Sequence, residues 1–396
     1  MTTTVRTTTL EVYTHNGVEW QFVGGCYAAS CSFGFDQRVA EATVRRTGGG
    51  EAEVNYWSPI RIDMGCAPGH GLATRFLGYV VPVENALYPV EGTLVCKGRL
   101  YRAQWVRNTH PGGTDLGLPS VGTPDEEQVQ AVLTECGVPF LAGNIGGTGK
   151  ALGAHALDFE NPVVAGPFTW AEGATGLDYI EQLDAVSVPD DASGRFRTFE
   201  TLGGDVFRIP MATAPHTTPD FSFAEGVDVL EARITRDPAG AANRVVVTGG
   251  PTDITGGVVG VEDLDVYRFT AAAPSGSAPY LPPGLPNGPD GYPQVTASFG
   301  SPMLEKALIT DPLVSEDVLS CQAVATFLLA EYNCVLDTLE LATPRDDLLG
   351  PGQTIHLHSP RLGITDPDQH YWLQRLEITL DERGAFTQRL TCVRRS

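Results

Sequence analysis

The chain has 396 residues, of which 42% are apolar, and its formal net charge is −22 at pH 7. This length predicts two or three domains with cores of their own, because domains usually have roughly 100–200 residues. The acidic surface argues against nucleic-acid binding, which depends on Lys and Arg that neutralise phosphates. The sequence contains no run of about 18 apolar residues, so no membrane span is predicted. The first residues, MTTTVRTTTLEV, lack the apolar segment of a secretory signal.

The first part of the chain is predicted to consist of short strands. TLEVYT (9–14) and VEWQFV (18–23) alternate polar and apolar residues on either side of the turn HNG, which predicts a hairpin. The alternation continues with Gly and Pro between the stretches, and it predicts a β-barrel or a sandwich. The further stretches are RVAEATVRR, PIRIDMG, RFLGYVVPVE, GTLVCKGRL and YRAQWVR (101–107).

The pattern changes near residue 120, where TPDEEQVQAVLTECGVP predicts a helix. Thr123 is its expected N-cap, Pro124 its first helical residue, and Glu126 the partner of Thr123 in a capping box. Gly137 suits the position just after the helix, and Pro139 prevents the helix from continuing.

A second helix is predicted in ATGLDYIEQLDAVSVP, with Thr175 as its cap and Leu177, Ile180 and Leu183 on its apolar face. The segment TFETLGGDVFRIP (198–210) then predicts a hairpin around two glycines. Together these elements predict a small α/β insert within a mainly β chain.

Strands are expected to return in the second half of the chain. VDVLEARITRDPAGAANRVVVTGG (227–250) predicts two strands around the turn DPAGAAN. Residues 271–293 are rich in Pro, Gly and Ser and predict a long loop. SEDVLSCQAVATFLLAEYN (315–333) predicts a long helix capped by Ser315. Four strands are predicted to end the chain, namely VLDTLELA, QTIHLHS, HYWLQRLEITLD and AFTQRLTCVR, the last two joined by the turn DERG.

The glycine-rich stretch GNIGGTGKALG (143–153) has the composition of a phosphate-binding loop but not its pattern. The motif G-x-x-x-x-G-K-[ST] requires a glycine where this chain has Asn144 and a hydroxyl where it has Ala151. We therefore predict a flexible surface loop, in which glycine accepts positive φ at little cost.

The candidates for metal ligands lie near the C-terminus. His356 and His358 are two residues apart on a predicted strand and therefore face the same way. Asp366, Asp368 and His370 follow, and two imidazoles with a carboxylate can hold a transition metal. The alternative, which the sequence favours, is a strand with polar residues toward solvent, so neither a metal site nor a cofactor is predicted.

The eight cysteines include no C-x-x-C pair. Cys26 and Cys31 are close enough in sequence to suggest a metal or cluster site, whose ligand spacing would be decisive. Disulfides typically stabilise small secreted domains that lack a core, so buried thiols that pack as small hydrophobes are the favoured interpretation.

No pattern predicts a catalytic residue, and the chain is predicted not to be an enzyme. The G-x-S-x-G, H-E-x-x-H and catalytic-cysteine signatures are absent from the sequence. A cell-wall hydrolase, which would need two carboxylates about 5–10 Å apart across a cleft, stays open as one alternative. A cell-wall or carbohydrate-binding β module is another, and clustered exposed aromatic residues would favour it. The tryptophans are instead expected to be dispersed and buried; they are Trp20, Trp57, Trp105, Trp170 and Trp372.

Several segments, in order along the chain, resemble the tail hub proteins of tailed bacteriophages. The resemblance rests on the strands at 75–106, the helix at 123–139, the Trp, helix and hairpin at 167–210, the strands at 225–250, and the closing strands at 348–394. The proline-rich loop 271–293 has no counterpart in it.

This resemblance implies two tail-tube-like β-barrel domains, at 1–115 and 216–396, with the α/β insert at 116–215 between them. It implies a homotrimeric ring at the tip of the virion tail, which joins a six-fold tail tube to a three-fold tip. The implied partners are the distal tail protein, the tape-measure protein and tail fibre or receptor-binding proteins. Genomic DNA would pass through a lumen whose carboxylates keep it from sticking.

Overall fold

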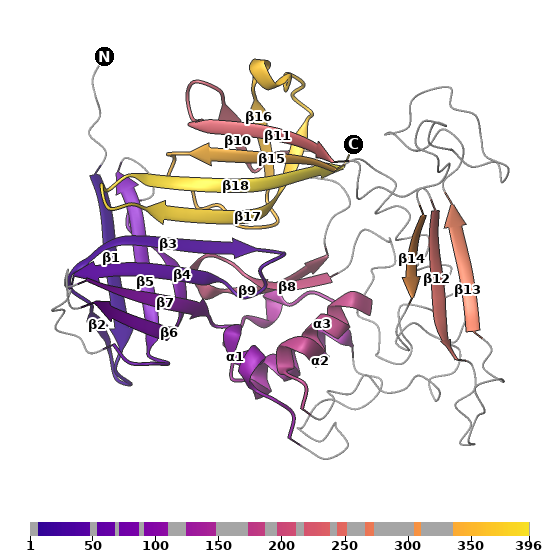
Figure 1. Cartoon of the computed structure of the whole chain (residues 1–396), viewed down its shortest axis with the longest axis horizontal. Helices are drawn as coiled ribbons and strands as arrows, with labels where there is room; N and C mark the ends of the chain where they lie inside the picture. Colours follow the sequence, from indigo (N-terminus) through magenta and orange to yellow (C-terminus); the bar gives the residue numbers. More distant parts are fainter. Residues whose placement is uncertain are drawn as a thin grey trace.

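The structure of the chain is a computed structural model (Figure 1). It describes residues 7–47, 54–67, 71–86, 91–109, 124–147, 173–186, 196–210, 218–237, 244–251, 266–272, 305–309 and 336–395. Several expectations concern residues outside these ranges, among them the helix at 315–333, the loop 271–293 beyond Ala272, the turn DPAGAAN beyond Asp237, and the N-cap Thr123. Among the described helices, none combines the length and the apolar character needed to cross a membrane.

The described residues of the N-terminal region form seven strands, of which the alternating pattern predicts six and does not predict Cys26–Gly34. The HNG turn is confirmed: β1 pairs antiparallel with β2, and the Asn16 side chain accepts hydrogen bonds from the backbone N–H groups of Val18 and Glu19, both at 2.9 Å. The strands are β1 (Thr7–His15), β2 (Trp20–Phe22), β3 (Cys26–Gly34), β4 (Glu41–Thr47), β5 (Pro59–Ala67), β6 (Ala73–Ala86) and β7 (Glu91–Gly98).

The prediction of a strand at 101–107 is wrong, because Tyr101–Trp105 forms the short helix α1. The Ala103 N–H donates to the Leu100 carbonyl at 3.0 Å, and the Val106 N–H donates to the Arg102 carbonyl at 3.0 Å. Leu100 and Ala103 are fully buried in the apolar cluster of the insert. Packing against the insert therefore decides the conformation of a segment whose alternation is too short to specify it.

The described part of the insert forms two α-helices, two short 3-10 helices and one hairpin. They are α2 (Asp125–Glu135), η1 (Ala142–Asn144), α3 (Gly176–Val186), β8 (Phe196–Glu200), η2 (Leu202–Gly204) and β9 (Val206–Pro210). The predicted cap of α3 is confirmed: the Thr175 hydroxyl accepts from the Asp178 N–H at 3.1 Å, and Asp178 accepts from the Thr175 N–H at 2.9 Å. The Gly203–Gly204 turn is confirmed too, with φ of +74° at both residues.

The structure tests only one of the two predicted ends of α2 in full. The helix begins at Asp125, one residue later than predicted, and the capping box stays a prediction because it depends on Thr123, outside the described residues. At the other end Gly137 has φ +63°, and the Val138 N–H donates to the Leu133 carbonyl at 2.8 Å, as in a Schellman motif.

The C-terminal region supplies six strands to the large sheet, and its last four are where the sequence predicted them. The turn between β17 and β18 contains Gly384 at φ +76°, as expected. The elements are β10 (Phe221–Ala224), β11 (Glu231–Asp237), β15 (Leu336–Thr343), β16 (Thr354–His358), η5 (Pro360–Leu362), β17 (His370–Leu380) and β18 (Phe386–Arg395).

A three-stranded sheet is formed by β12 (Arg244–Pro251), β13 (Val266–Ala272) and β14 (Glu305–Ile309), with β12 in the middle. The predicted strands on either side of the DPAGAAN turn are therefore β11 and β12. They do not pair with each other, because β11 joins the large sheet beside β15.

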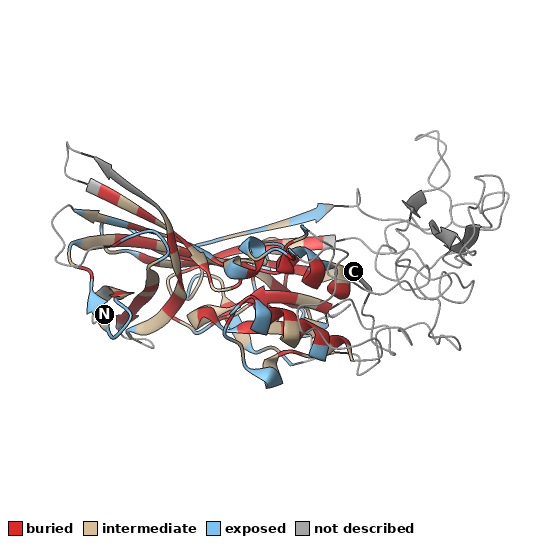
Figure 2. Cartoon of the chain, turned by 90° about the horizontal axis from the view of Figure 1, so that it is seen from below, coloured by how far each residue is buried: buried red, intermediate tan, exposed pale blue. Residues whose placement is uncertain are grey.

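The strands of the N-terminal and C-terminal regions belong to one sheet of 13 strands. Its central pairing is β3 with β17, in which Phe33 lies opposite Leu376 (Figure 1). Figure 2 shows buried residues along the strands and exposed residues at several of their turns. The predicted fold class, mainly β with an α/β insert, is confirmed. The boundaries at 115 and 215, and the division into two barrels, stay predictions.

Candidate functional site

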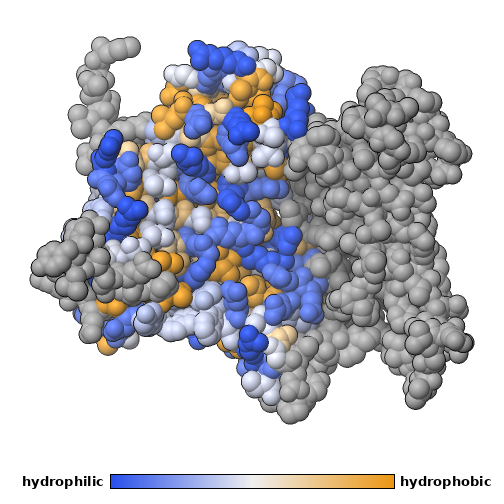
Figure 3. Space-filling model, in the orientation of Figure 1, coloured by the Kyte–Doolittle hydropathy of each residue, from blue (hydrophilic) through white to orange (hydrophobic). Residues whose placement is uncertain are grey.

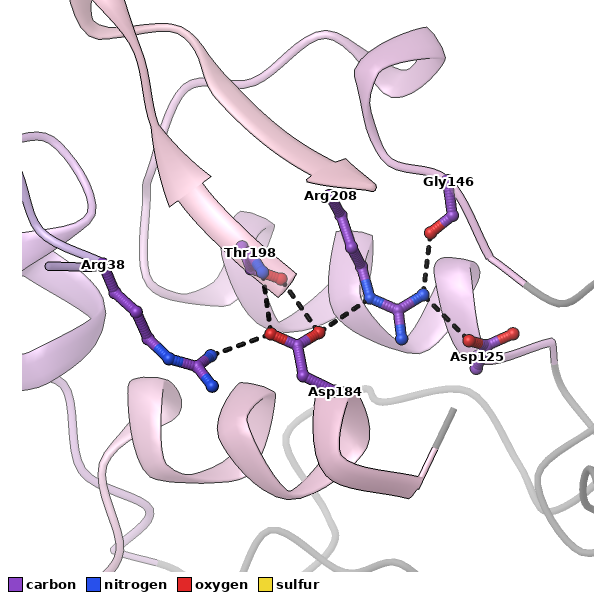
Figure 4. A network of polar contacts seen from close by, with 6 residues as sticks. All are labelled: Arg38, Asp125, Gly146, Asp184, Thr198 and Arg208. Carbon is purple, nitrogen blue, oxygen red and sulfur yellow. Dashed lines mark hydrogen bonds and ion pairs between the residues drawn. The ribbon is translucent and has the colours of Figure 1, made fainter. Parts of the chain in front are cut away.

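Asp184 on α3 is the centre of a buried polar network in the insert (Figure 4). The Thr198 N–H donates to its Oδ2 at 2.8 Å and the Thr198 hydroxyl to its Oδ1 at 3.1 Å. Arg38 Nη1 donates to Oδ2 at 2.8 Å, and Arg208 Nε donates to Oδ1 at 2.9 Å. One carboxylate thus joins α3 to β8, to β9 and to the segment between β3 and β4.

Arg208 on β9 is fully buried and extends this network to α2. Its Nη1 donates to Asp125 Oδ2 at 2.8 Å and to the Gly146 carbonyl at 2.7 Å. Its guanidinium carbon lies 4.5 Å from the centre of the Phe196 ring. Because both acidic partners are themselves buried, each charge depends on the other for compensation.

The start of the glycine-rich stretch is fixed rather than mobile. Ala142–Asn144 forms η1, Ile145 is 4% exposed, and the Gly146 N–H donates to the Arg208 carbonyl at 2.9 Å. The prediction of a flexible surface loop therefore fails for this part, because both backbone groups of Gly146 bond to Arg208. Lys150 lies outside the described residues.

Glu200 on β8 is a buried carboxylate held by backbone groups. Its Oε2 accepts from the Ala40 N–H at 2.8 Å and its Oε1 from the Leu100 N–H at 2.8 Å. Burial raises the pKa of Glu200 to about 7, although these hydrogen bonds oppose the rise. Gly98 leaves room for the carboxylate, since a Cβ there would lie 1.9 Å from Oε2. The Glu200 carboxylate therefore joins β8 to the backbone just before β4 and just after β7.

An ion pair joins Arg75 on β6 to Asp346 in the segment between β15 and β16, and both side chains are fully buried. It thus links the N-terminal and C-terminal regions. Arg75 Nε donates to the Met64 carbonyl at 3.1 Å, and the Cys66 N–H donates to Asp346 Oδ2 at 2.8 Å. Carboxylates enclosed in this way are closed to a substrate. The paired acids of the networks therefore do not form the open cleft that glycoside hydrolysis needs.

The structure brings two of the three candidate histidines together. His356 on β16 lies opposite His370 on β17, with ring centres 5.8 Å apart. His356 Nδ1 lies 3.2 Å from the Gln369 carbonyl oxygen. The pair therefore bridges two strands through ring contact.

The other candidate ligands point to no shared centre. His358 is exposed at the end of β16, and Asp366 Oδ1 accepts from the Asp368 N–H at 2.9 Å within a turn. Within the described ranges, no three His, Cys, Asp or Glu residues are grouped as metal binding would require.

The described cysteines behave as the sequence predicts, since none of the six forms a disulfide and five are buried. Burial raises the pKa of the Cys136 thiol to about 12 and that of Cys26 to about 11. Such thiols stay protonated and pack as small hydrophobes. Cys321 and Cys334 lie outside the described residues.

The expectation of dispersed, buried tryptophans is wrong for Trp57 and Trp105. Their ring centres lie 5.4 Å apart, and 42% of Trp57 and 58% of Trp105 is exposed. Tyr79 and Tyr101 complete the cluster, which we call the aromatic patch. The sequence could not reveal this contact, because Trp57 precedes β5 whereas Trp105 ends α1. Trp372 is buried as expected, and Trp170 lies outside the described residues.

No family model matches the chain, and no curated protein matches it. Solved structures do. A 43 kDa tail protein of prophage MuSo2 from Shewanella oneidensis is 10% identical at a TM-score of 0.61, and the match covers 98% of each chain. A tail protein from Neisseria meningitidis MC58 is 11% identical at a TM-score of 0.59, covering 97% of this chain and 96% of that one.

Prophage tail protein gp18 from Listeria monocytogenes EGD-e is 11% identical at a TM-score of 0.52, with 97% of this chain and 94% of that chain covered. All three matches run through nearly the whole of both chains, so the likeness includes the insert as well as the sheet. The chain therefore has the fold of prophage tail proteins.

Proposed function

We propose that the chain is a structural tail protein, and more specifically a hub at the tip of a phage tail or a tail-like particle. The observation that carries this proposal is the likeness to the tail protein of prophage MuSo2 across 98% of both chains. A partial match would fit a widespread β module, whereas agreement over strands, insert and closing strands fits the complete architecture of a tail protein.

In this proposal three copies form a ring that joins the tail tube to the tip. The distal tail protein binds on one side and tail fibre or receptor-binding proteins on the other, while the tape-measure protein reaches the ring from the tube. The ring lets genomic DNA pass during ejection. The net charge of −22 supports this, since carboxylates along a lumen would repel the phosphate backbone.

The role is assembly rather than catalysis. The buried acids of the networks described above, Asp125, Asp184, Asp346 and Glu200, are engaged with arginines or with backbone N–H groups. Such groups position strands and helices and have no open side toward a substrate.

Single-particle imaging of the purified chain, alone and mixed with the tail proteins encoded beside it, tests the proposal. We expect three-fold rings with an open centre, either in the chain alone or after the neighbours are added. Compact monomers under both conditions would contradict the hub and would favour a cell-surface binding module, to be probed on glycan arrays.

A further inference from the structure

The aromatic patch of Trp57, Tyr79, Tyr101 and Trp105 is a continuous surface built from three separate segments. The Trp57 ring stacks on Tyr101 at 5.8 Å and meets Trp105 edge-on at 5.4 Å, and Tyr79 lies 6.0 Å from Trp57. Tyr56, the neighbour of Trp57 in the sequence, is 66% exposed. Large aromatic side chains gathered on a surface mark an interaction site far more often than single exposed ones do.

The backbone at Trp57 adopts a strained conformation, and this conformation places the indole on the surface within the patch. Trp57 has φ +64° and is the one non-glycine residue with positive φ among the described residues. It is held there by hydrogen bonds from its N–H to the Val80 carbonyl at 2.8 Å and from the Ser58 N–H to the Asn55 carbonyl at 3.1 Å. A bulky residue at such a φ lowers the stability of the fold, whereas glycine would adopt this φ without that cost. The strain at Trp57 therefore points to a role of the indole other than stabilising the fold.

The chemistry of the patch suits a protein partner better than a sugar. Exposed Arg102 lies beside it, with its guanidinium carbon 6.0 Å from the Tyr79 ring centre. Trp, Tyr and Arg are the residues that dominate binding at the centres of protein interfaces. The Trp57 and Tyr101 rings also stack on each other, so one face of each ring is not accessible for stacking against a sugar.

A complementary surface occurs elsewhere on the same chain, in the turn between β10 and β11. Val227 is 78% exposed and Leu230 is 62% exposed, and the exposed residue Glu231 stands next to Leu230. Two other acids of this turn are already paired, Asp228 with Arg345 at 3.7 Å and Glu225 with Arg361 at 2.9 Å. We call residues 225–231 the acidic turn. It offers aliphatic groups to the aromatic rings and the exposed carboxylate of Glu231 to Arg102, so the apolar character matches and one charge is complementary.

The two surfaces lie on opposite sides of the molecule. Figure 1 places α1 below the large sheet and the strands β10 and β11 at its upper edge. Figure 3, in the same orientation, shows hydrophobic residues among hydrophilic ones at this upper end. One copy therefore cannot bring its own patch and turn together, whereas neighbouring copies can.

We infer that the aromatic patch of one copy binds the acidic turn of a second copy of this chain. The contact is heterologous, that is, two different surfaces meet, and such contacts close into a ring when the rotation between copies allows it. This inference rests on the proposed function in requiring a ring of copies, and it deepens that proposal by naming the contact surfaces.

The test compares the mass of the assembled full-length chain with that of two single variants. Trp105→Ala removes the most exposed ring of the patch, and Leu230→Asp removes an apolar contact from the turn. We expect each to weaken assembly by at least about 30-fold in dissociation constant, as for an interface hot spot. Phe22→Ala and Val18→Asp alter residues that are likewise exposed but lie on or beside β2, and they should leave assembly unchanged.

Mixing the two variants gives the sharper result. A Leu230→Asp copy keeps its patch and a Trp105→Ala copy keeps its acidic turn, so the mixture can restore one contact but cannot close a ring. We expect dimers containing one copy of each variant, measured by mass photometry, while each variant alone stays monomeric. Circular dichroism and thermal unfolding verify that both variants fold.

Other outcomes overturn the inference and separate it from the proposed function. If the chain forms rings and both variants form them equally well, copies meet through other surfaces and only this inference fails. If the unaltered chain stays monomeric even with its tail partners, both fail. If soluble cell-wall glycan fragments then change the Trp fluorescence, and Trp105→Ala removes that change, the patch binds sugar instead.

Discussion

The large sheet and the insert differ in how far buried charges join their elements. The core of the sheet is mainly apolar, with side chains such as Phe33 and Leu376 fully buried, and it also holds the Arg75–Asp346 ion pair. The insert has an apolar cluster between α2 and α3, but its hairpin is joined to those helices by the charges of Arg208 and Asp184. Apolar packing tolerates gradual change of shape, whereas an ionic network requires every partner in place.

The difference follows from what each region can bury. Strands with alternating residues bury a continuous apolar face over many pairings. The hairpin β8–β9 is short, and it meets α2, α3 and the N-terminal strands at once. Directional bonds from Arg208, Asp184 and Glu200 fix its position against three neighbours, which apolar contacts on so small an element would specify less well.

The largest expected effect is that of Arg208→Ala. It removes the ion pair between Arg208 and Asp125 and one of the two arginines bound to Asp184, and both acids are buried. We expect the free energy of unfolding to fall by roughly 3–5 kcal/mol, because uncompensated charge stays in the interior. Urea unfolding measures the change, and limited proteolysis shows whether the insert opens first.

Arg45→Ala is the matched control for Arg208→Ala. Arg45 also pairs with a carboxylate, that of Glu382, but both side chains are 57% exposed. The expected change is within about 1 kcal/mol, as for other surface ion pairs. Equal effects of the two variants would mean that the insert does not depend on its buried charges, and the contrast between the regions would fail.

In the sheet, Leu376→Ala should lower the free energy of unfolding by roughly 2–5 kcal/mol, the usual cost of a cavity in an apolar core. Leu376 is fully buried and lies opposite Phe33 where the N-terminal and C-terminal strands pair. Leu376→Met, which nearly conserves volume, should cost less than about 1.5 kcal/mol. Chemical denaturation of both variants provides the measurement, and similar losses would argue against close packing at this junction.

The pH dependence of stability gives a third comparison. Glu200 has a folded-state pKa raised from 4.5 to about 7, so the folded chain holds this proton more tightly than the unfolded chain does. The stabilisation is complete below about pH 4.5 and is lost as the pH rises to about 7, amounting to about 3 kcal/mol. Glu200→Gln should remove this dependence, although the amide also replaces one acceptor by a donor.

The measurement for Glu200 is the difference in unfolding free energy between the unaltered chain and Glu200→Gln at several pH values. This difference should shrink or change sign as the pH rises from about 4.5 to about 7. Glu41→Gln, at a largely exposed residue paired with Lys97, should show no such trend. A constant difference for Glu200→Gln would mean that the carboxyl group is ionised throughout this range.

The smallest effect is expected at the start of α3. Thr175→Ala removes the hydroxyl that accepts from the Asp178 N–H, and it should cost about 1 kcal/mol. Thr175→Ser keeps the hydroxyl and should restore most of that loss. Thermal unfolding of the three proteins is sufficient, and an unchanged midpoint for Thr175→Ala would show that tertiary packing alone fixes the helix end.

Local features were predictable from the sequence because the responsible residues are neighbours in the chain. The HNG turn depends on Asn16, the end of α2 on Gly137, the β17–β18 turn on Gly384 and the start of α3 on Thr175. Each side chain or glycine acts on backbone within a few residues of itself. The alternation of the strands likewise identified most of the sheet.

Only the tertiary structure decided which distant residues meet. The pairing of β3 with β17, the Arg208 network and the contact of Trp57 with Trp105 join segments with no sequence signal linking them. The helix α1 was mistaken for a strand because burial of Leu100 and Ala103 against the insert outweighs a weak local pattern. The sequence by itself thus determined most of the elements and several turns, because these depend on neighbouring residues, and long-range packing decided α1, the buried charges and the exposed aromatic patch.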